Sequence, residues 1–257
     1  MIGAVCVTLP AGYTAFRASG SLFVCRTELS AELYGVAAET GSLYRWAAAH
    51  PQRETVQGRG TAYIVPFGGG RVVVRHYRRG GRLAAVLGDR YLRAAMPRPV
   101  RELRTSRAAA ERGIPVADVL AVAVYQPVSL LYRGDAVTSY VSGASDLAAR
   151  VFGDAATPAS AAAAAEVAGH TVRRAHDRGL EHRDLNLKNV LIAERAGALS
   201  GVIIDLDRAR VVDTLSDAAR RAMLARFERS WRKWARRTGR AAADALAAFR
   251  SGYEAAS

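Results

Sequence analysis

One eight-residue run, His182–Asn189, constrains this chain more than any other feature. It reads His-Arg-Asp-Leu-Asn-Leu-Lys-Asn and places the carboxylate of Asp184 five residues before the amide of Asn189. One tight loop can direct both side chains to the same point, where a carboxylate can accept a proton and oxygen atoms can hold a divalent cation. Two short apolar runs separated by a glycine-bracketed turn follow at once, so the sequence predicts a β-hairpin directly after the loop.

The run matches His-Arg-Asp-Leu-x-x-x-Asn, which is the catalytic loop of protein-kinase-like enzymes. The resemblance implies that Asp184 accepts the proton of the attacking hydroxyl and that Asn189 binds Mg²⁺. Asp205 ends the hairpin, at the place of the second Mg²⁺ ligand. Leu206 and Asp207 stand where phenylalanine and glycine are usual, and Asp207 fits a structural cap or a further ligand, with the cap favoured. His182 at the head of the loop is expected to anchor the loop to the Asp205 strand.

A glycine-rich turn lies well before these motifs. Gly58, Gly60 and Thr61 belong to a Gly-Arg-Gly-Thr sequence that leads into a predicted strand. In protein-kinase-like enzymes such a hairpin covers the phosphates of ATP with backbone N–H groups, because glycine lets the chain approach closely. Tyr63 occupies the place of a third glycine, so the turn alone also fits a plain β-turn. Its place ahead of the catalytic loop favours an ATP site.

Arg75 occupies the position of the kinase lysine that contacts the α- and β-phosphates of ATP. Arginine also binds phosphate, but its planar fork is not equivalent to an ammonium group, and a solvent-facing strand arginine is the alternative interpretation. In such enzymes this residue pairs with a glutamate on the next helix. We expect that glutamate to be Glu102, with Glu111 as the second choice.

The end of the chain argues against a protein substrate. Only 52 of the 257 residues follow Asp205, and they contain no Ala-Pro-Glu sequence. A protein kinase places an activation segment and several helices here to bind its peptide, and we do not expect these to fit. The position two residues after Asp184 holds Asn186 and not the lysine common in Ser/Thr kinases. A small-molecule or lipid-linked acceptor is therefore the expected substrate class.

A more specific resemblance is carried by Arg75–Gly81, which reads Arg-His-Tyr-Arg-Arg-Gly-Gly and is not a general kinase feature. The same likeness covers Gly58–Thr61, Asp89–Tyr91, Glu102, Gly113–Val116, the loop residues Asp184–Asn186 with Asn189, and a basic tail from Met223 to Lys233. Together these segments, from about Glu39 to the C-terminus, resemble the 3-deoxy-D-manno-octulosonic acid (Kdo) kinase family. That family belongs to the lipopolysaccharide kinases of Gram-negative bacteria.

The resemblance implies an α+β, protein-kinase-like fold with a small β-rich lobe and a mainly helical lobe. It implies phosphorylation of a Kdo hydroxyl, the 4-OH, on a Kdo-bearing lipid A precursor, with ATP and Mg²⁺ as cofactors and arginine at position 75. We expect an N-terminal extension over residues 1–55, an N-lobe over 56–138, and a C-lobe with basic C-terminal helices over 139–257.

The net charge of +14 favours association with a polyanion, whether nucleic acid, anionic membrane or phosphorylated glycolipid. The sequence contains no zinc-finger spacing, basic-heptad helix or aromatic RNA-binding motif, so we expect no nucleic-acid partner, and we predict no stable protein partner. Two basic regions, 75–93 and 220–240, are candidates for holding the glycolipid and for docking on an anionic membrane. The alternative for the second region is that its aromatic face packs onto the C-lobe.

The expected location is cytoplasmic, peripheral on the inner face of the bacterial inner membrane. No run of about 18 apolar residues is present, and the N-terminus lacks the basic start and cleavage site of an export signal. Cys6 and Cys25 are interpreted as reduced packing residues, as is usual in the cytoplasm.

Two alternatives to the Kdo kinase stay open. The first is a kinase for another sugar or small hydroxylated acceptor, such as a heptose or an aminoglycoside, although a chain of charge +14 is poorly suited to a cationic aminoglycoside. The second is a nucleotide-binding pseudokinase scaffold without turnover, which Arg75 and the missing Phe-Gly would suit. The presence of Asp184, Asn189 and Asp205 together argues against the scaffold.

Overall fold

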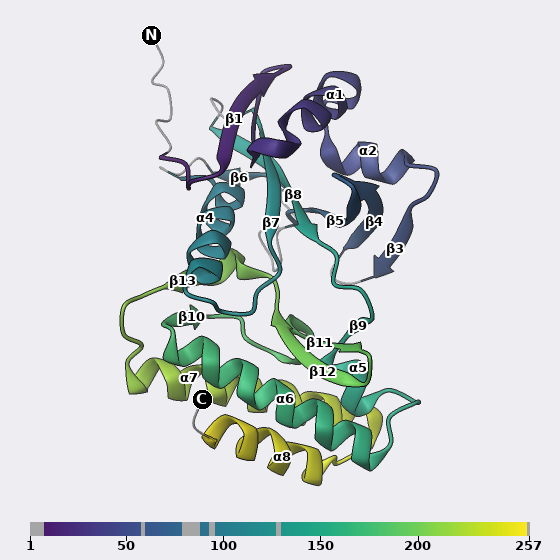
Figure 1. Ribbon diagram of the computed structural model, residues 1–257, viewed down its shortest axis with the longest axis vertical. Helices are drawn as coiled ribbons and strands as arrows, with labels where there is room; N and C mark the ends of the chain where they lie inside the picture. The colour runs from purple at the N-terminus through teal and green to yellow at the C-terminus, as the bar shows by residue number, and fades with distance from the viewer. Residues whose placement is uncertain (1–7, 58–59, 79–87, 93–95, 127–129, 256–257) are drawn as a thin grey trace. The chain divides into compact units, whose positions relative to one another are not determined.

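The structure is a computed structural model that describes residues 8–57, 60–78, 88–92, 96–126 and 130–255 (Figure 1). The chain divides into two compact units. The first comprises Met1–Arg107 and Asp118–Tyr140, and the second comprises Ala108–Ala117 and Val141–Ser257. The first unit is built on an antiparallel sheet and the second is mainly helical, which confirms the α+β class.

The sheet of the first unit has the strand order β1-β2-β7-β8-β5-β4-β3, with β6 paired to β8. All of its paired strands run antiparallel. Residues 8–55, which belong to the segment predicted as an N-terminal extension, contribute β1, β2, the start of β3 and two α-helices. The strands are β1 (Tyr13–Ala18), β2 (Ser21–Arg26), β3 (Glu54–Gln57), β4 (Thr61–Phe67), β5 (Gly70–His76), β6 (Tyr91–Leu92), β7 (Val119–Tyr125) and β8 (Leu131–Ser139).

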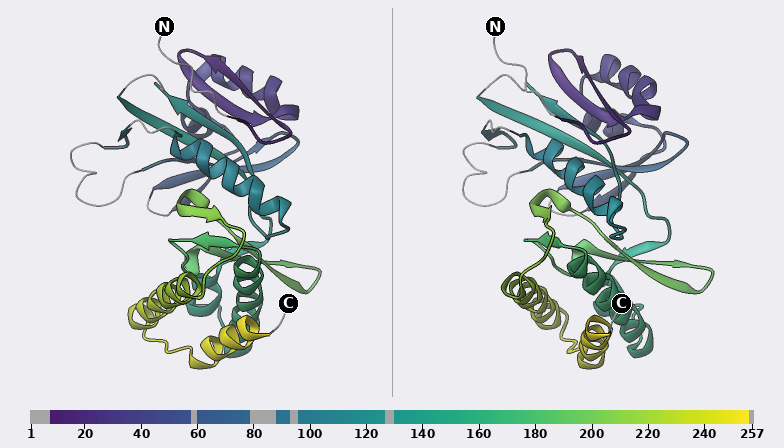
Figure 2. Two further views of the ribbon diagram at one scale, coloured as in Figure 1. Left: turned by 90° about the vertical axis from the view of Figure 1, so that its left-hand side faces the viewer. Right: turned by 60° about the vertical axis from the view of Figure 1, so that its left-hand side comes forward.

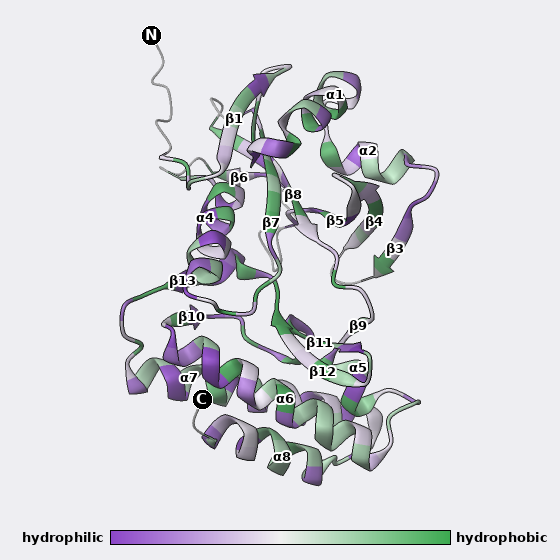
Figure 3. Cartoon of the chain, in the orientation of Figure 1, coloured by the Kyte–Doolittle hydropathy of each residue, from purple (hydrophilic) through white to green (hydrophobic). Residues whose placement is uncertain are grey.

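Helices cover both faces of this sheet (Figures 1 and 2). A short 3₁₀ turn (Thr27–Leu29), α1 (Ser30–Thr40) and α2 (Leu43–Ala49) pack on one face, and α4 (Arg98–Glu111) packs on the other. Strand β7 is therefore almost wholly apolar (Figure 3). Its Ala121, Ala123 and Tyr125 belong to the core under α1 and α2, while Val122 and Val124 belong to the core under α4. The two-residue period of a strand sends alternate side chains to the two cores.

The second unit holds two small sheets and four helices within the described residues. Strands β9 (Ala144–Asp146), β11 (Val190–Arg195) and β12 (Ala198–Ile203) form one sheet, and β10 (Leu180–His182) pairs with β13 (Ala209–Val211). The hairpin predicted after the His182–Asn189 loop is β11–β12. The helices are α5 (Leu147–Phe152), α6 (Pro158–Asp177), α7 (Asp217–Thr238) and α8 (Ala243–Glu254), and the 3₁₀ turns are Leu187–Asn189 and Leu206–Arg208.

Thr157 caps the start of α6 by accepting a hydrogen bond from the Ser160 N–H, and Pro158 follows as the first helical residue. The core of this unit forms where α6, α7 and α8 meet. Phe227 and Trp231 of α7 are buried, and the ring of Phe227 stacks on Phe249 of α8 with centroids 4.4 Å apart. The aromatic face of α7 therefore packs into the unit, as the alternative interpretation of this region proposed. Among the described residues, no helix is both long enough and apolar enough to cross a bilayer.

Helices α6 and α8 approach closely at two glycines. A Cβ added to Gly169 would collide with the carbonyl oxygen of Phe249 and would lie 2.7 Å from the backbone nitrogen of Tyr253. A Cβ added to Gly252 would collide in the same way with the carbonyl oxygen of Glu166. The clashing atoms belong to the helix backbone, which cannot shift without disturbing the helix. Glycine is therefore required at both contacts.

We predict that Gly169→Ala destabilises the protein although alanine is the better helix former. Helix propensity favours alanine by about 1 kcal/mol, while overpacking a close contact costs roughly 1–3 kcal/mol. Gly35 on α1 is the matched control because a Cβ there meets nothing within 4 Å. Chemical denaturation should show Gly169→Ala less stable than wild type and Gly35→Ala more stable by up to about 1 kcal/mol. Equal effects of the two changes would contradict the close helix approach.

Candidate active site

The first residue of the His182–Asn189 loop, the buried His182, anchors the loop. The backbone N–H of Asp184 donates to Nδ1 of His182 over 3.2 Å, and Nε2 of His182 lies 3.2 Å from the carbonyl oxygen of Ile204. Burial lowers the pKa of His182, so the ring is neutral at physiological pH. Because Nδ1 accepts, the proton lies on Nε2 and is donated to Ile204. His182 thus links the loop to the residue before Asp205, as the sequence predicted.

Two amides hold the backbone of Asp184 in place. Asn186 Nδ2 and Asn189 Nδ2 both donate to the Asp184 carbonyl oxygen, over 2.7 and 3.0 Å. The amide group of Asn189 is thereby oriented, and its Oδ1 is the atom left to bind a metal. Asn186 does a second task, because its Oδ1 accepts from the backbone N–H of Lys188 over 3.0 Å. No pattern in the sequence indicated that the Asn186 side chain holds the loop in this way.

A backbone hydrogen bond of the preceding residue, Ile204, holds Asp205 near this loop. The N–H of Ile204 donates to the carbonyl oxygen of Asn189 over 3.0 Å, which joins the end of β12 to the loop. Asp205 itself adopts a left-handed conformation with φ 62° and ψ 59°. Non-glycine residues rarely adopt this conformation, and such strain concentrates at functional sites. The 3₁₀ turn that follows buries Leu206, the residue in the position of the usual phenylalanine.

The oxygen donors fit Mg²⁺. The Oδ1 of Asn189 and the carboxylate of Asp205 are hard ligands, and Mg²⁺ in phosphoryl-transfer sites is held by one or two protein groups together with phosphate oxygens. The described residues include no group of three or more His, Cys, Asp or Glu side chains placed to hold a metal. One amide oxygen and one carboxylate suit a cation that also binds phosphate oxygens. The roles of Asn189 and Asp205 as ligands stay predictions.

An arginine from α7 also reaches the loop. Nη1 of Arg226 lies 3.6 Å from Oδ1 of Asp184, and the exposed fractions of the two side chains are 46% and 19%. One turn earlier on the same helix, Sδ of Met223 accepts from the backbone N–H of His182 over 3.1 Å. The sequence analysis missed Arg226, because α7 carries many basic residues and nothing in its spacing distinguishes this one.

In the first unit, Arg75 of β5 pairs with Glu102 of α4, as predicted. Glu102 is 1% exposed, and its second oxygen accepts from the hydroxyl of Tyr77. Glu111, the second choice, lies exposed at the end of α4. A carboxylate this deeply buried costs several kcal/mol unless it is paired and hydrogen-bonded, and Arg75 and Tyr77 provide those contacts. The pair orients the guanidinium of Arg75, whose contact with phosphate stays a prediction.

The predicted phosphate turn is described in part. Gly58 lies outside the described residues, while Gly60 and Thr61 lead into β4. The carbonyl oxygen of Thr61 accepts from the hydroxyl of Tyr44 over 3.0 Å. The Tyr44 ring contacts His76 with centroids 5.5 Å apart, so it connects the start of β4 to the end of β5.

A second buried carboxylate, Asp135, supports the strand that carries Arg75. It is fully buried on β8 and accepts from the Tyr44 N–H over 2.8 Å, from the Tyr125 hydroxyl, and from the Ser42 hydroxyl over 3.3 Å. Its other oxygen lies 2.5 Å from Nδ1 of His76. Asp135 therefore ties β5, β7, β8 and the start of α2 together. No motif in the sequence pointed to it.

His76 is held between two carboxylates. Nδ1 faces Asp135, and Nε2 lies 2.8 Å from an oxygen of Asp89. Burial, the largest single influence, favours the neutral ring, but the hydrogen bonds and charges of Asp135 and Asp89 together outweigh it and raise the pKa of His76 above 6.5. The imidazolium is therefore the form that the two carboxylates stabilise.

The two units have the features of a protein-kinase-like fold: a β-rich unit with an arginine–glutamate pair, and a helical unit with the His182–Asn189 loop and an aspartate after the next hairpin. The model of the lipopolysaccharide kinase (Kdo/WaaP) family matches residues 45–253. The chain belongs to this family.

Similar proteins include two named 3-deoxy-D-manno-octulosonic acid kinase. That of Xylella fastidiosa (strain M12) is 37% identical over 162 residues, which cover 62% of this chain and 61% of that protein. That of Stenotrophomonas maltophilia (strain R551-3) is 37% identical over 175 residues, which cover 67% and 66%. The matched segment thus spans about three-fifths of the first of these relatives. A solved structure of WaaP in complex with acyl carrier protein aligns over 79% of this chain and 78% of its own, with 20% identity and a TM-score of 0.49.

We predict that His76 titrates above pH 6.5 and that Asp89→Asn lowers its pKa, because one of two stabilising carboxylates is removed. Titration of the imidazole resonances by NMR, assigned with His76→Gln, measures both. A group with a raised folded pKa adds stability that is full below its unfolded pKa and is lost as pH rises through the folded value. Wild type should therefore lose stability relative to His76→Gln above pH 6.5. A pKa at or below 6.5 would contradict the arrangement.

Proposed function

We propose that this protein is an ATP-dependent kinase that phosphorylates a hydroxyl of Kdo, the 4-OH, on a lipid A precursor in lipopolysaccharide core biosynthesis. The observation that carries the proposal is the loop geometry: Asp184 is held by His182, Asn186 and Asn189, and the loop is bonded through the Ile204 backbone to the strand that ends at Asp205. The family and the names of the similar proteins support the acceptor class.

Asp184 acts on the acceptor. Its carboxylate accepts a hydrogen bond from the Kdo hydroxyl and orients the oxygen toward the γ-phosphate. It takes up the proton as the new P–O bond forms and the bond from the γ-phosphorus to the bridging oxygen breaks, which releases ADP. The hydrogen bonds of Asn186 and Asn189 to its carbonyl oxygen keep the loop from moving during this step. Most of the catalysis then comes from positioning and from neutralising the charge on the phosphates, since phosphoryl transfer asks little covalent chemistry of the protein.

The nucleotide is assigned to the remaining predicted residues. Asn189 and Asp205 hold Mg²⁺, which when bound neutralises charge on the phosphates. The backbone of Gly58, Gly60 and Thr61 covers the phosphates. Arg75, oriented by Glu102, contacts them as the lysine does in other enzymes of this fold.

We expect Asp184→Asn to lower the rate of phosphate transfer by roughly 10²- to 10⁴-fold, the usual contribution of a general base. The amide keeps the size of the side chain but cannot accept the proton. The measurement is transfer of labelled γ-phosphate from ATP to a Kdo-bearing lipid A precursor. Turnover unchanged in Asp184→Asn would remove the catalytic assignment.

The matched control for that experiment is Arg75→Ala. Asp184→Asn should retain Mg·ATP binding, whereas Arg75→Ala should weaken it, so titration calorimetry with Mg·ATP separates the nucleotide role from the acceptor role. Wild-type protein that binds Mg·ATP tightly but transfers nothing to the Kdo acceptor would favour another acceptor or a pseudokinase scaffold.

We also propose that the protein docks on the anionic inner face of the inner membrane through basic residues of the 220–240 region. Exposed arginines of α7, among them Arg221, Arg229 and Arg236, are available for this contact. Each basic residue near an anionic surface contributes about 1 kcal/mol, and salt screens that attraction. Binding to vesicles that contain phosphatidylglycerol should therefore fall roughly tenfold or more as salt rises from low to physiological concentration. Binding independent of salt would contradict electrostatic docking.

A further inference from the structure

A stripe of basic side chains on α7 begins at the catalytic loop. Arg226, Lys233 and Arg237 follow at spacings of seven and four residues, which return side chains to one side of a helix. All three are exposed. We call Arg226, Lys233 and Arg237 the α7 stripe. It spreads three positive charges along roughly 16 Å of helix, at 1.5 Å per residue.

Buried neighbours on both sides anchor the helix at Arg226. Its neighbours Met223 and Phe227 are buried, with 4% and 0% of their surface exposed, and Met223 contacts the backbone of His182. The helix is therefore fixed against the loop by Met223, one turn before Arg226, and against α8 by Phe227, directly after it. A binding group whose helix is held in this way is pre-organised for its ligand.

The contact of Arg226 with Asp184 adds little to the stability of the folded protein. A pair this exposed contributes about 0–1 kcal/mol. So weak a pair leaves the guanidinium of Arg226 able to bind an anion beside Asp184. The guanidinium fork has five donors, and within the described part of the chain Asp184 is its only partner for an ion pair or a hydrogen bond.

The far end of the stripe is held by an aromatic ring. The guanidinium carbon of Arg237 lies 5.2 Å from the centroid of Trp234, and the ammonium nitrogen of Lys188 lies 6.0 Å from the same ring. Lys188 belongs to the catalytic loop and also lies 3.9 Å from Asp146. Cation–π contacts of this kind hold cations in place while leaving their N–H groups able to bind anions. The stripe is thus continuous with the loop at Arg226 and at Lys188.

We propose that Arg226 binds the carboxylate of the acceptor sugar acid on the ring whose hydroxyl Asp184 deprotonates, and that Lys233 and Arg237 bind phosphates further along the acceptor. The inference rests on the proposed function. Since Arg226 lies 3.6 Å from Asp184, the anion that it binds must lie within one sugar ring of the reacting hydroxyl. A sugar acid carries its carboxylate on that ring, whereas the lipid A phosphates lie on neighbouring sugars. The planar fork of arginine also matches a carboxylate in two-point contact.

The test combines a change in the enzyme with a change in the acceptor. The acceptors are the Kdo-bearing lipid A precursor in detergent and the same molecule with the Kdo carboxylate converted to its methyl ester. Arg226→Ala should raise the KM for the natural acceptor roughly 10- to 100-fold, the usual loss for a hydrogen-bonded charge. The KM for ATP should not change. Wild type should suffer a similar loss on the ester, and Arg226→Ala should suffer little further loss, because both changes remove the same contact.

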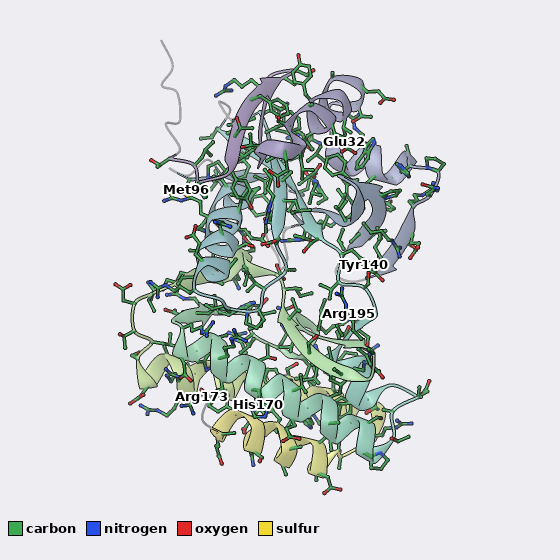
Figure 4. All side chains as sticks on the ribbon, in the orientation of Figure 1. Glu32, Met96, Tyr140, His170, Arg173 and Arg195 are labelled. Atoms are coloured by element: carbon green, nitrogen blue, oxygen red, sulfur yellow. The ribbon has the colours of Figure 1, made fainter. Side chains whose placement is uncertain are left out.

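Two further variants complete the design. Arg226→Lys keeps the charge without the fork and should recover part of the affinity for the natural acceptor. Arg195, an exposed arginine at the end of β11 in the same unit (Figure 4), is the control for loss of one positive charge, and Arg195→Ala should discriminate between the two acceptors as wild type does. Both positions are exposed, so the thermal stability of all variants should match wild type.

Three outcomes would overturn the inference. If the methyl ester raised the acceptor KM by the same factor in wild type and in Arg226→Ala, Arg226 would not contact the carboxylate. A change in kcat and in its pH profile, with the acceptor KM unchanged, would show that Arg226 acts only on Asp184. No transfer by wild type would overturn the proposed function and this inference with it, while transfer without coupling would overturn this inference alone.

Discussion

The geometry of the catalytic loop depends on one buried, neutral histidine. His182 accepts from the backbone of Asp184 and donates to Ile204, so one ring determines both the path of the loop and the place where the β12 strand delivers Asp205. A charged ring could not accept at Nδ1, and burial is what keeps it neutral. The unusual backbone of Asp205 is tolerated because the strand before it is bonded to this loop.

In the first unit, buried carboxylates orient the side chains at the end of β5. Glu102 and Asp135 lie on different elements, and each accepts hydrogen bonds from at least two other residues. They hold adjacent residues of β5, because Glu102 pairs with Arg75 and Asp135 with His76. Removing one partner of such a pair leaves a charge in the interior, so the network tolerates little change. The buried carboxylates take the place of apolar side chains that could stabilise the core, and they orient the guanidinium of Arg75.

The parts of the site that sequence reasoning predicted are those with local spacing. The distance along the chain from Asp184 to Asn189 and the hairpin before Asp205 follow from short-range geometry, and Glu102 follows from the expected pairing with the strand arginine. Asp135 and Arg226 were missed for the opposite reason. Asp135 lies 59 residues from His76, and Arg226 is one basic residue among many on its helix. Gly58 lies outside the described residues, so its predicted role was not tested there.

The sequence by itself determined the chemical class of the loop, the secondary structure around it and the family, because these depend on residue types at fixed short spacings. The tertiary structure alone decided which distant side chains join those motifs. It placed Met223 against the loop and Arg226 beside Asp184, and it buried Asp135 among donors from α2, β5 and β7. Such contacts arise from packing between segments far apart in the chain, and packing depends on the whole fold and not on any local pattern.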